Sequence, residues 1–551
     1  MMNKWFKSGK PWIWLNAAAV SVNMILVFGL LGLIANRGLQ HFWPSSVASF
    51  TYQRGPSSHT TIIGEITDSE EVSAEQIKDA GGILPDDVIT ATQLLIKAGN
   101  RDLTGQDFKW ILQNNIIEKQ YPPEILTIER REWGNFYGYP IALKKNGKII
   151  SEDQKLMVAL NRQLVTTQLL FDEIKQIEKN DIGTINYDLE NLRIKKRKLT
   201  LEKRWNDKVA EQHATKKADY EQQYQTLQTR LAKLYQAIQK DSLVAKVADG
   251  RETEIPLSKI VHAYQPNKMS FWQKISLYSE KFVEFLVDEP REANTEGGIF
   301  PAIFGTVMMV IIMSIIVTPF GIVAAVYLRE YANQGLVTRI IRIAVNNLAG
   351  VPSIVYGVFG LGFFVYFLGG NLDQLFFPER LPSPTFGTPG ILWASLTLAL
   401  LTLPVVIVAT EEGLARIPSA IRQGSLALGA TKAETLWRIV LPMASPAMMT
   451  GLILGVARAA GEVAPLMLVG VVKLAPSLPL DGNFPFLHLD RKFMHLGFHI
   501  YDVGFQSPNV EAARPLVFAT AFLLVLVIIA LNLTAVSVRN NLREKYQSLE
   551  N

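Results

Sequence analysis

Long uncharged stretches dominate the second half of the chain, and one more lies near its start. Each supplies the ~20 apolar positions that a membrane-spanning helix needs. The uncharged stretches are residues 12–35, 297–328, 343–372, 390–410 and 515–538. A sixth stretch, 446–472, is interrupted only by Arg458 and Glu462. The hydrophobic pattern therefore predicts an α-helical polytopic membrane protein with six spans.

The first apolar stretch follows Lys4, Lys7 and Lys10, a charge pattern that also suits a signal peptide. The stretch is longer than a normal signal-peptide core, and no small-residue cleavage site follows it, so we interpret it as a retained anchor. Positive charge in short loops then orients the spans. With a cytoplasmic N-terminus, every short basic loop falls on the same side. These loops carry Arg329, Arg339 and Arg342, then Arg416, Arg422, Lys432 and Arg438, and finally Arg539, Arg543 and Lys545.

The predicted domains follow from this topology. Residues 1–36 form a cytoplasmic tail and the first span, and residues 37–296 form an extracytoplasmic insertion large enough for a core of its own. Residues 297–540 form a five-helix core with a cytoplasmic loop at 411–445, and residues 541–551 form a cytoplasmic tail.

The insertion combines helical and extended patterns, so we predict an α+β unit. Two apolar stripes at helical spacing predict a helical hairpin with a coiled-coil seam near 151–242, with "NDIGT" (180–184) as the break between its arms. The stripes are Met157, Leu160, Leu164, Phe171 and Ile174, and Tyr220, Tyr224, Leu227, Leu231, Leu234 and Ile238. On either side of the hairpin, alternating segments with Asn-Gly and Asp-Gly turns predict strands.

Composition narrows the function classes. The 551 residues are 48% hydrophobic and 19% charged, which is typical of a membrane protein. The net charge of +5 is small for this length, and the basic run Arg193 to Lys198 lacks interleaved aromatics, so we expect a solvated helix face and no nucleic-acid partner. The absence of cysteine excludes disulfides and thiolate chemistry.

A short loop between two spans, "ALGATKAETLWRIVLP" (427–442), has its own pattern. Thr431 and Glu434 predict a capping box after a bend at Gly429. Leu436, Ile439 and Val440 predict one apolar stripe, which Pro442 should end. By local pattern alone, an ordinary helical connector fits as well.

This loop resembles the so-called EAA loop of ABC-importer permeases, which docks in a groove of the cytoplasmic ATPase. Gly429 and the Ile-x-Leu-Pro ending match, whereas Gln423, Gly424 and Ser425 replace the Glu-Ala-Ala opening. Four further segments resemble phosphate-import permeases of the PstA type over about residues 295–540: "GGIFPAIFGT", "AAVYLREYA", "NNLAGVPSIVYGVFGLGFF" and "ARAAGEVAPLMLVG", with Val463 where a threonine is usual. The resemblance implies that ATPase coupling involves Ala427, Gly429, Ala430, Thr431, Leu436, Ile439, Leu441 and Pro442.

The family resemblance also implies partners. They are a second permease subunit, an ATPase dimer and a periplasmic phosphate-binding protein, in the inner membrane. No G-x-x-x-x-G-K-[ST] motif occurs in the chain, so we expect no cofactor in this chain, no enzyme activity of its own, and ATP bound by the partner ATPase.

Arg458 and Glu462 are the ionisable pair within a predicted span. Their i, i+4 spacing places both on one helix face, where they can pair. A guanidinium matches phosphate oxygens bidentately, so Arg458 could exchange Glu462 for the transported anion; helix locking by the neutralised pair is the alternative. The PstA resemblance implicates both residues in the translocation pathway.

Three histidines, His488, His495 and His499, cluster in the last outer loop. The last two have a spacing that suits zinc, but no carboxylate or cysteine completes the set, so we predict an interfacial amphipathic helix and no metal. Kinks from Pro319, and from Gly350 and Pro352 in the third span, are interpreted as packing devices. Two alternatives to phosphate import stay open, a permease for sulfate or molybdate and a membrane-anchored scaffold or sensor.

Overall fold

The computed structural model describes residues 8–55, 58–79, 89–152, 155–507 and 510–547. The predicted charges Lys4 and Lys7 and the end of the C-terminal tail, 548–551, lie outside the described residues. The chain divides into two units. One comprises Met1–His41, Ile299–Pro508 and Arg514–Asn551, and the other Phe42–Gly298 and Asn509–Ala513.

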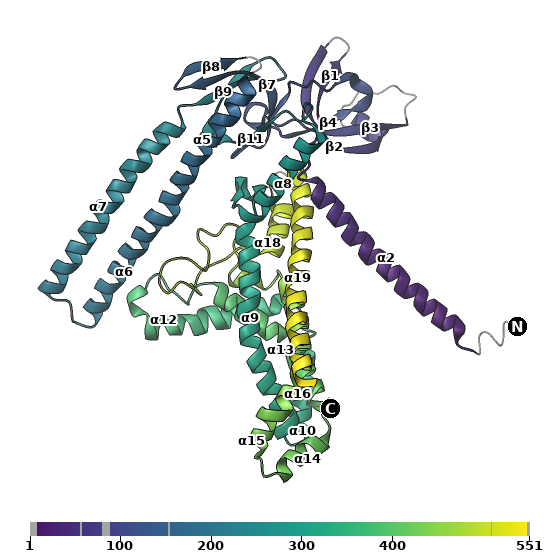
Figure 1. Cartoon of the computed structure of the whole chain (residues 1–551), viewed down its shortest axis with the longest axis vertical. Helices are drawn as coiled ribbons and strands as arrows, with labels where there is room; N and C mark the ends of the chain where they lie inside the picture. Colours follow the sequence, from purple (N-terminus) through teal and green to yellow (C-terminus); the bar gives the residue numbers. More distant parts are fainter. Residues whose placement is uncertain (1–7, 56–57, 80–88, 153–154, 508–509, 548–551) are drawn as a thin grey trace. The chain divides into compact units, whose positions relative to one another are not determined.

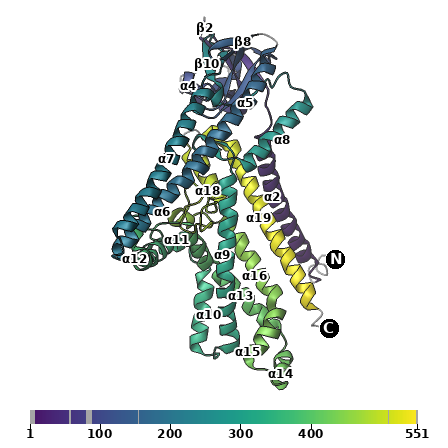
Figure 2. The same cartoon turned by 60° about the vertical axis from the view of Figure 1, so that its left-hand side comes forward.

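The first unit is helical (Figures 1 and 2). Its helices are α2 (Lys10–Gln40), α9 (Phe300–Val326), η6 (Tyr327–Tyr331), α10 (Leu336–Leu348), α11 (Ser353–Phe359), η7 (Gly360–Gly369), α12 (Gly370–Phe376), η8 (Pro378–Arg380), α13 (Ile391–Arg416), α14 (Ser419–Ala427), α15 (Lys432–Thr435), η9 (Leu436–Val440), α16 (Leu441–Gly461), α17 (Leu466–Val469), α18 (Leu496–Tyr501), η10 (Asp502–Gln506) and α19 (Val510–Gln547). Among the described residues, six helical stretches are long and apolar enough to cross a membrane: Pro11–Gln40, Phe300–Tyr331, Ser353–Phe376, Ile391–Arg416, Lys432–Gly461 and Ala513–Glu544. The structure thus has six candidate spans, the number that the hydrophobic pattern predicts.

Helix α13 is the centre of this bundle. In its apolar window 67% of the residues are buried, against 33% or less in each of the other spans. Small residues bring the neighbouring helices close: a Cβ on Gly321 of α9 would lie 2.5 Å from Val406, and one on Gly451 of α16 would lie 2.7 Å from Ala409. Such close approach gives the van der Waals contact that drives helix association in lipid.

Two predicted spans have shifted bounds. The third does not begin at 343, because Pro352 has an extended ψ of 133° and starts a new helix at Ser353. Gly350 and Pro352 therefore separate α10 from the span rather than kink it. The sixth runs from Lys432 to Gly461 instead of 446–472. The predicted kink residue Pro319 does lie inside α9.

The second unit is α+β. Its strands are β1 (Val47–Gly55), β2 (Ser58–Ser73), β3 (Thr90–Lys97), β4 (Phe108–Leu112), β5 (Ile116–Gln120), β6 (Leu126–Arg130), β7 (Phe136–Lys145), β8 (Lys148–Glu152), β9 (Ser242–Lys246), β10 (Glu252–Pro256), β11 (Ile260–Tyr264), β12 (Pro290–Arg291) and β13 (Glu296–Gly297). Its helices are α3 (Ala74–Asp79), α4 (Arg101–Thr104), η1 (Gln113–Asn115), α5 (Leu156–Gln176), η3 (Ile177–Asp181), α6 (Ile182–Leu201), α7 (Asp207–Ile238), η4 (Leu257–Lys259), α8 (Phe271–Val287) and η5 (Glu292–Asn294).

Two larger antiparallel sheets dominate the described part of this unit, and β12 pairs with β13 in a third, two-stranded sheet. One has the order β4-β3-β2-β1-β5, and the other has β10-β9-β7-β6-β11 with β8 paired to β7. The strands predicted on either side of the hairpin are confirmed, with the Asn146-Gly147 turn joining β7 to β8 and the turn at Gly250 joining β9 to β10. Leu156 and Leu160 of α5 are buried in the core of the second sheet.

The helical hairpin is present, but its turn is misplaced in the sequence prediction. The π-helical turn η3 carries α5 into α6 without a break, and α7 runs back alongside them (Figures 1 and 2). A single glycine, Gly183, weakens a helix by only ~1 kcal/mol and does not end it. The chain reverses instead at Lys203, where φ is 55°, and Asn206 caps α7 by accepting a hydrogen bond from Val209 N. The basic run Arg193 to Lys198 lies on α6, where Arg193 pairs with Glu190 at 2.5 Å.

Candidate translocation and coupling sites

The loop between α13 and α16 forms the local structure that its sequence indicates. Gly429 has φ of 91°, a region that favours glycine, and so ends α14 with a sharp bend. The predicted capping box is confirmed: Thr431 Oγ1 accepts from Glu434 N at 3.2 Å, and Thr431 N donates to Glu434 Oε2 at 2.9 Å. These bonds satisfy backbone donors that a helix start leaves unpaired.

Pro442 does not end the new helix. The π-helical turn η9 precedes it, and α15, η9 and α16 form one continuous helix into the membrane span. Pro442 lies in the first turn of α16. There the wider turn accommodates the missing N–H donor, and the short amphipathic helix becomes the first part of a span.

The predicted apolar stripe faces inward. Leu436 is 4% exposed and Val440 is fully buried, so neither presents an apolar surface for docking. They pack in a cluster with Leu414, Ile417, Ala444 and Met448. The most exposed large apolar side chains here are instead Leu428, at 91%, and Trp437, at 73%, with Leu426 less exposed. Of the remaining predicted coupling residues, Ala427, Gly429 and Thr431 are exposed, and Ala430, Ile439, Leu441 and Pro442 are half-buried.

Polar contacts that the sequence did not indicate hold this loop. Arg422 of α14 donates to the carbonyls of Leu414 at 2.7 Å and Ile417 at 2.8 Å, and pairs with Glu330 of η6 at 2.9 Å. These contacts tie α14 to the ends of α13 and α9. Leu428 and Trp437 project from the surface of this loop, which we call the braced surface because the Arg422 contacts hold it in place.

The ion pair predicted within the span exists at its end. Arg458 Nε lies 3.6 Å from Glu462 Oε1, with 33% and 21% of the two side chains exposed. Arg458 belongs to α16, but the helix ends at Gly461, and Glu462 has extended backbone with ψ of 134°. The two residues therefore do not share a helix face as predicted. The pair instead joins the last turn of α16 to the extended residue that follows the helix.

The turn after Arg458 is packed tightly from two sides. A Cβ on Gly357 of α11 would lie 2.7 Å from Pro465 Cα, and one on Gly497 of α18 would lie 2.6 Å from a Val463 methyl. Helices α11 and α18 thus approach the turn as closely as glycine allows. Their position fixes the segment that carries Glu462.

The three outer-loop histidines do not converge. His488 pairs with Asp481 at 2.9 Å, His495 Nδ1 accepts from Gly497 N at 3.1 Å, and His499 lies 3.5 Å from the Thr520 hydroxyl. Burial lowers the pKa of His495 to about 3, so this imidazole is neutral. Most of the segment is buried within the helical unit, so it lacks the broad exposed polar face of an amphipathic surface helix.

Its burial follows from contacts with α9. Leu496 N donates to Thr306 Oγ1 at 2.9 Å, and a Cβ on Gly305 would lie 2.1 Å from the Met494 carbonyl. A second charge pair, Lys473 with the buried Asp502 at 3.1 Å, lies in the segment between α16 and α19 and was not predicted. In the sequence, the only indication of this pair is that Lys473 and Asp502 are charged residues outside the apolar stretches.

Comparison with known proteins shows to which family the helical unit belongs. Residues 317–546 match the family described as binding-protein-dependent transport system inner membrane component. The PstA 1 phosphate transport system permease protein of Mycobacterium tuberculosis H37Rv is 34% identical over 247 residues, which cover 44% of this chain and 70% of that protein. The chain belongs to this permease family.

Other relatives agree with this membership. A probable phosphate transport system permease protein PstA of Methanocaldococcus jannaschii is 32% identical, covering 39% of this chain and 67% of that one. The probable ABC transporter permease protein YqgH of Bacillus subtilis is 32% identical over 36% of this chain, which spans 62% of that relative. An inward-facing structure of the MetNI methionine ABC transporter is 17% identical with a TM-score of 0.33, covering 44% of this chain and 94% of that chain.

The family assignment bears out two sequence predictions. The chain is a helical membrane permease with six candidate spans and a large additional α+β unit, and it is a transport subunit rather than an enzyme. The family match begins at residue 317, after the α+β unit.

Proposed function

We propose that the chain is the PstA-type permease subunit of an ATP-driven phosphate importer. Its membership of the permease family carries the proposal, and the relatives named as phosphate transport permeases supply the substrate. It would act with a second permease subunit, a cytoplasmic ATPase dimer and a periplasmic phosphate-binding protein. We place it in the inner membrane with both termini cytoplasmic and residues 37–296 periplasmic, in keeping with the basic short loops.

In this proposal Arg458 contacts the anion in transit. Its side chain is one-third exposed and lies 3.6 Å from Glu462, a loose pair that a competing anion can open. A guanidinium donates two parallel hydrogen bonds to phosphate oxygens, which a point charge cannot. Glu462 then receives the guanidinium again when phosphate leaves, so the empty pathway keeps a neutral pair.

Coupling to the ATPase is assigned to the braced surface around Gly429. Leu428 and Trp437 supply apolar anchors of the kind that dominate protein interfaces, and the Arg422 contacts keep their scaffold rigid. Leu436 and Val440, the two buried residues of the predicted stripe, pack against α13 and α16 and contribute to the stability of this loop.

Uptake of radiolabelled phosphate by the assembled importer in proteoliposomes tests the proposal. Arg458→Ala should abolish uptake, and Arg458→Lys should reduce it, with Arg539→Ala in the C-terminal helix as a control for loss of one cation. Normal uptake in Arg458→Ala would reduce the pair to a packing role. Uptake of sulfate or molybdate in preference to phosphate would contradict the proposal that phosphate is the substrate.

A protease experiment on spheroplasts tests the orientation. Protease added outside should cleave within residues 37–296 and leave the loop around Thr431 intact. Cleavage of that loop instead would invert the topology.

A further inference from the structure

One strand and one helix of the α+β unit bring three metal-ligand side chains together. His262 lies on β11, and Glu280 and Glu284 lie one turn apart on α8. One ligand atom from each lies within 4.8 Å of the other two. His262 Nε2 is 2.9 Å from Glu284 Oε2. One imidazole and two carboxylates form a ligand set that Zn²⁺ accepts in proteins.

The carboxylates of this cluster are only partly compensated, because His262 pairs with Glu284 and not with Glu280. Two carboxylates at i, i+4 on one helix repel each other. The ammonium of the intervening residue, Lys281, is held by Glu129 and the Tyr264 hydroxyl. Within the described part of the chain, no cationic side chain forms an ion pair with Glu280, so its carboxylate lies beside the His262–Glu284 pair without a cationic partner of its own.

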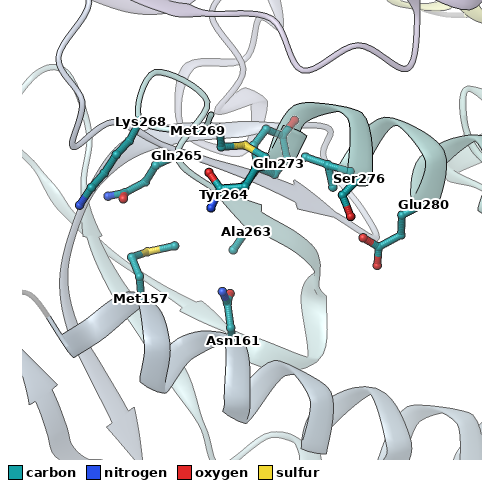
Figure 3. Close-up of a pocket in the computed structure, with 11 residues that line it drawn as sticks. Met157, Asn161, Ala263, Tyr264, Gln265, Lys268, Met269, Gln273, Ser276 and Glu280 are labelled. Carbon is teal, nitrogen blue, oxygen red and sulfur yellow. The ribbon is translucent and has the colours of Figure 1, made fainter. Parts of the chain in front are cut away.

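The cluster also borders an open groove. Glu280 lines a groove of about 460 Å³ together with residues of α5, β11 and α8. Figure 3 shows Glu280 at one end of this groove and Asn161 on its α5 side. Lining residues of the α8 side include Gln273 and Ser276. The groove gives an ion and its water ligands access to the cluster from solvent.

We propose that His262, Glu280 and Glu284 bind one Zn²⁺ ion. Ligand atoms at ~2.1 Å from a tetrahedral zinc are ~3.4 Å apart, so small side-chain rotations bring this cluster to ligating geometry. The ion replaces the hydrogen bond between His262 and Glu284, and water from the groove takes the fourth position. The site joins β11 to α8 and is independent of the transport residues in the helical unit.

Equilibrium titration of the full chain in lipid nanodiscs with Zn²⁺, read by a competing chromogenic chelator, tests the site. Wild-type protein should bind one Zn²⁺ per chain. His262→Gln and Glu280→Gln should each weaken binding by at least ~100-fold, because loss of a direct ligand exceeds the 10–100-fold cost of losing an outer partner. Glu280 is exposed, so its variant should fold normally.

Two matched controls remove comparable side chains elsewhere in the same unit. His59→Gln, on exposed β2, and Glu221→Gln, on α7, should bind Zn²⁺ within twofold of wild type. Failure of wild-type protein to bind one equivalent would overturn the proposal. Equal weak binding by all variants would show adventitious zinc only, and wild-type affinity in Glu280→Gln would overturn the three-ligand site.

Discussion

Replacing Leu436 and Trp437 separately by alanine distinguishes a support residue from a docking residue. Leu436 is 4% exposed within a cluster of five other buried side chains, so Leu436→Ala should cost 2–5 kcal/mol of stability, roughly the range for a buried leucine. Trp437 is 73% exposed, so Trp437→Ala should change stability by less than ~0.5 kcal/mol. If Trp437 anchors the ATPase, its loss should cost about 2 kcal/mol of binding, or roughly 30-fold in affinity.

The assay measures both quantities on the same samples. Thermal unfolding of the permease in nanodiscs reports stability, and titration with the partner ATPase reports affinity. Trp272→Ala, on α8 and 76% exposed, is the matched control and should leave both unchanged. Unchanged ATPase affinity in Trp437→Ala, or a stability loss as large as that of Leu436→Ala, would refute the assignment.

Three further predictions concern packing and charge. Lys281→Met should destabilise the α+β unit by ~3 kcal/mol in thermal unfolding, because it leaves the largely buried Glu129 without its cation. The double variant Lys281→Met/Glu129→Leu should recover most of this loss. Equal stability of the single and double variants would contradict the prediction. Burial raises the pKa of Glu296 to about 7 from 4.5, so its contribution to stability is full below pH ~4.5 and is lost as pH rises through ~7. Unfolding measured from pH 4 to 8 should show a decline of up to ~3 kcal/mol that Glu296→Gln removes; an identical decline in the variant would assign it to another group. Gly357→Ala should reduce phosphate uptake but retain ATPase binding, because its added Cβ would lie 2.7 Å from Pro465 Cα. The control Gly362→Ala, which has nothing within 4 Å of its added Cβ, should transport normally. Equal uptake by the two variants would contradict the packing argument.

Hydropathy and local capping were enough to predict the spans and the helix that starts at Lys432. A span is set by the composition of one contiguous stretch, and the capping box joins Thr431 to Glu434, three residues away, so both signals are local. The turns at Asn146 and Gly250 are local in the same way. These features formed where the sequence indicated them, apart from the bounds of the two shifted spans.

The errors arose where distant segments decide the outcome. The Leu436 stripe is amphipathic by its own sequence, but only the packing of Leu414 and Met448 against it shows which way it faces. Pro442 indicates a helix end locally, yet the continuous helix survives through a π-helical turn. Likewise, the Lys473–Asp502 pair joins residues 29 positions apart, and no spacing rule links them.

The position of Glu462 shows how a partly wrong prediction changes the proposed mechanism. On one rigid helix face, the carboxylate could leave Arg458 only by changing its side-chain rotamer. In the structure Glu462 lies just beyond the helix, on a turn whose backbone is packed against Gly357 and Gly497. Movement of α11 or α18 would therefore displace the carboxylate with its backbone and expose the guanidinium to the anion. This links the pair to helix movements that an ATPase can drive, which an intrahelical pair would not sense.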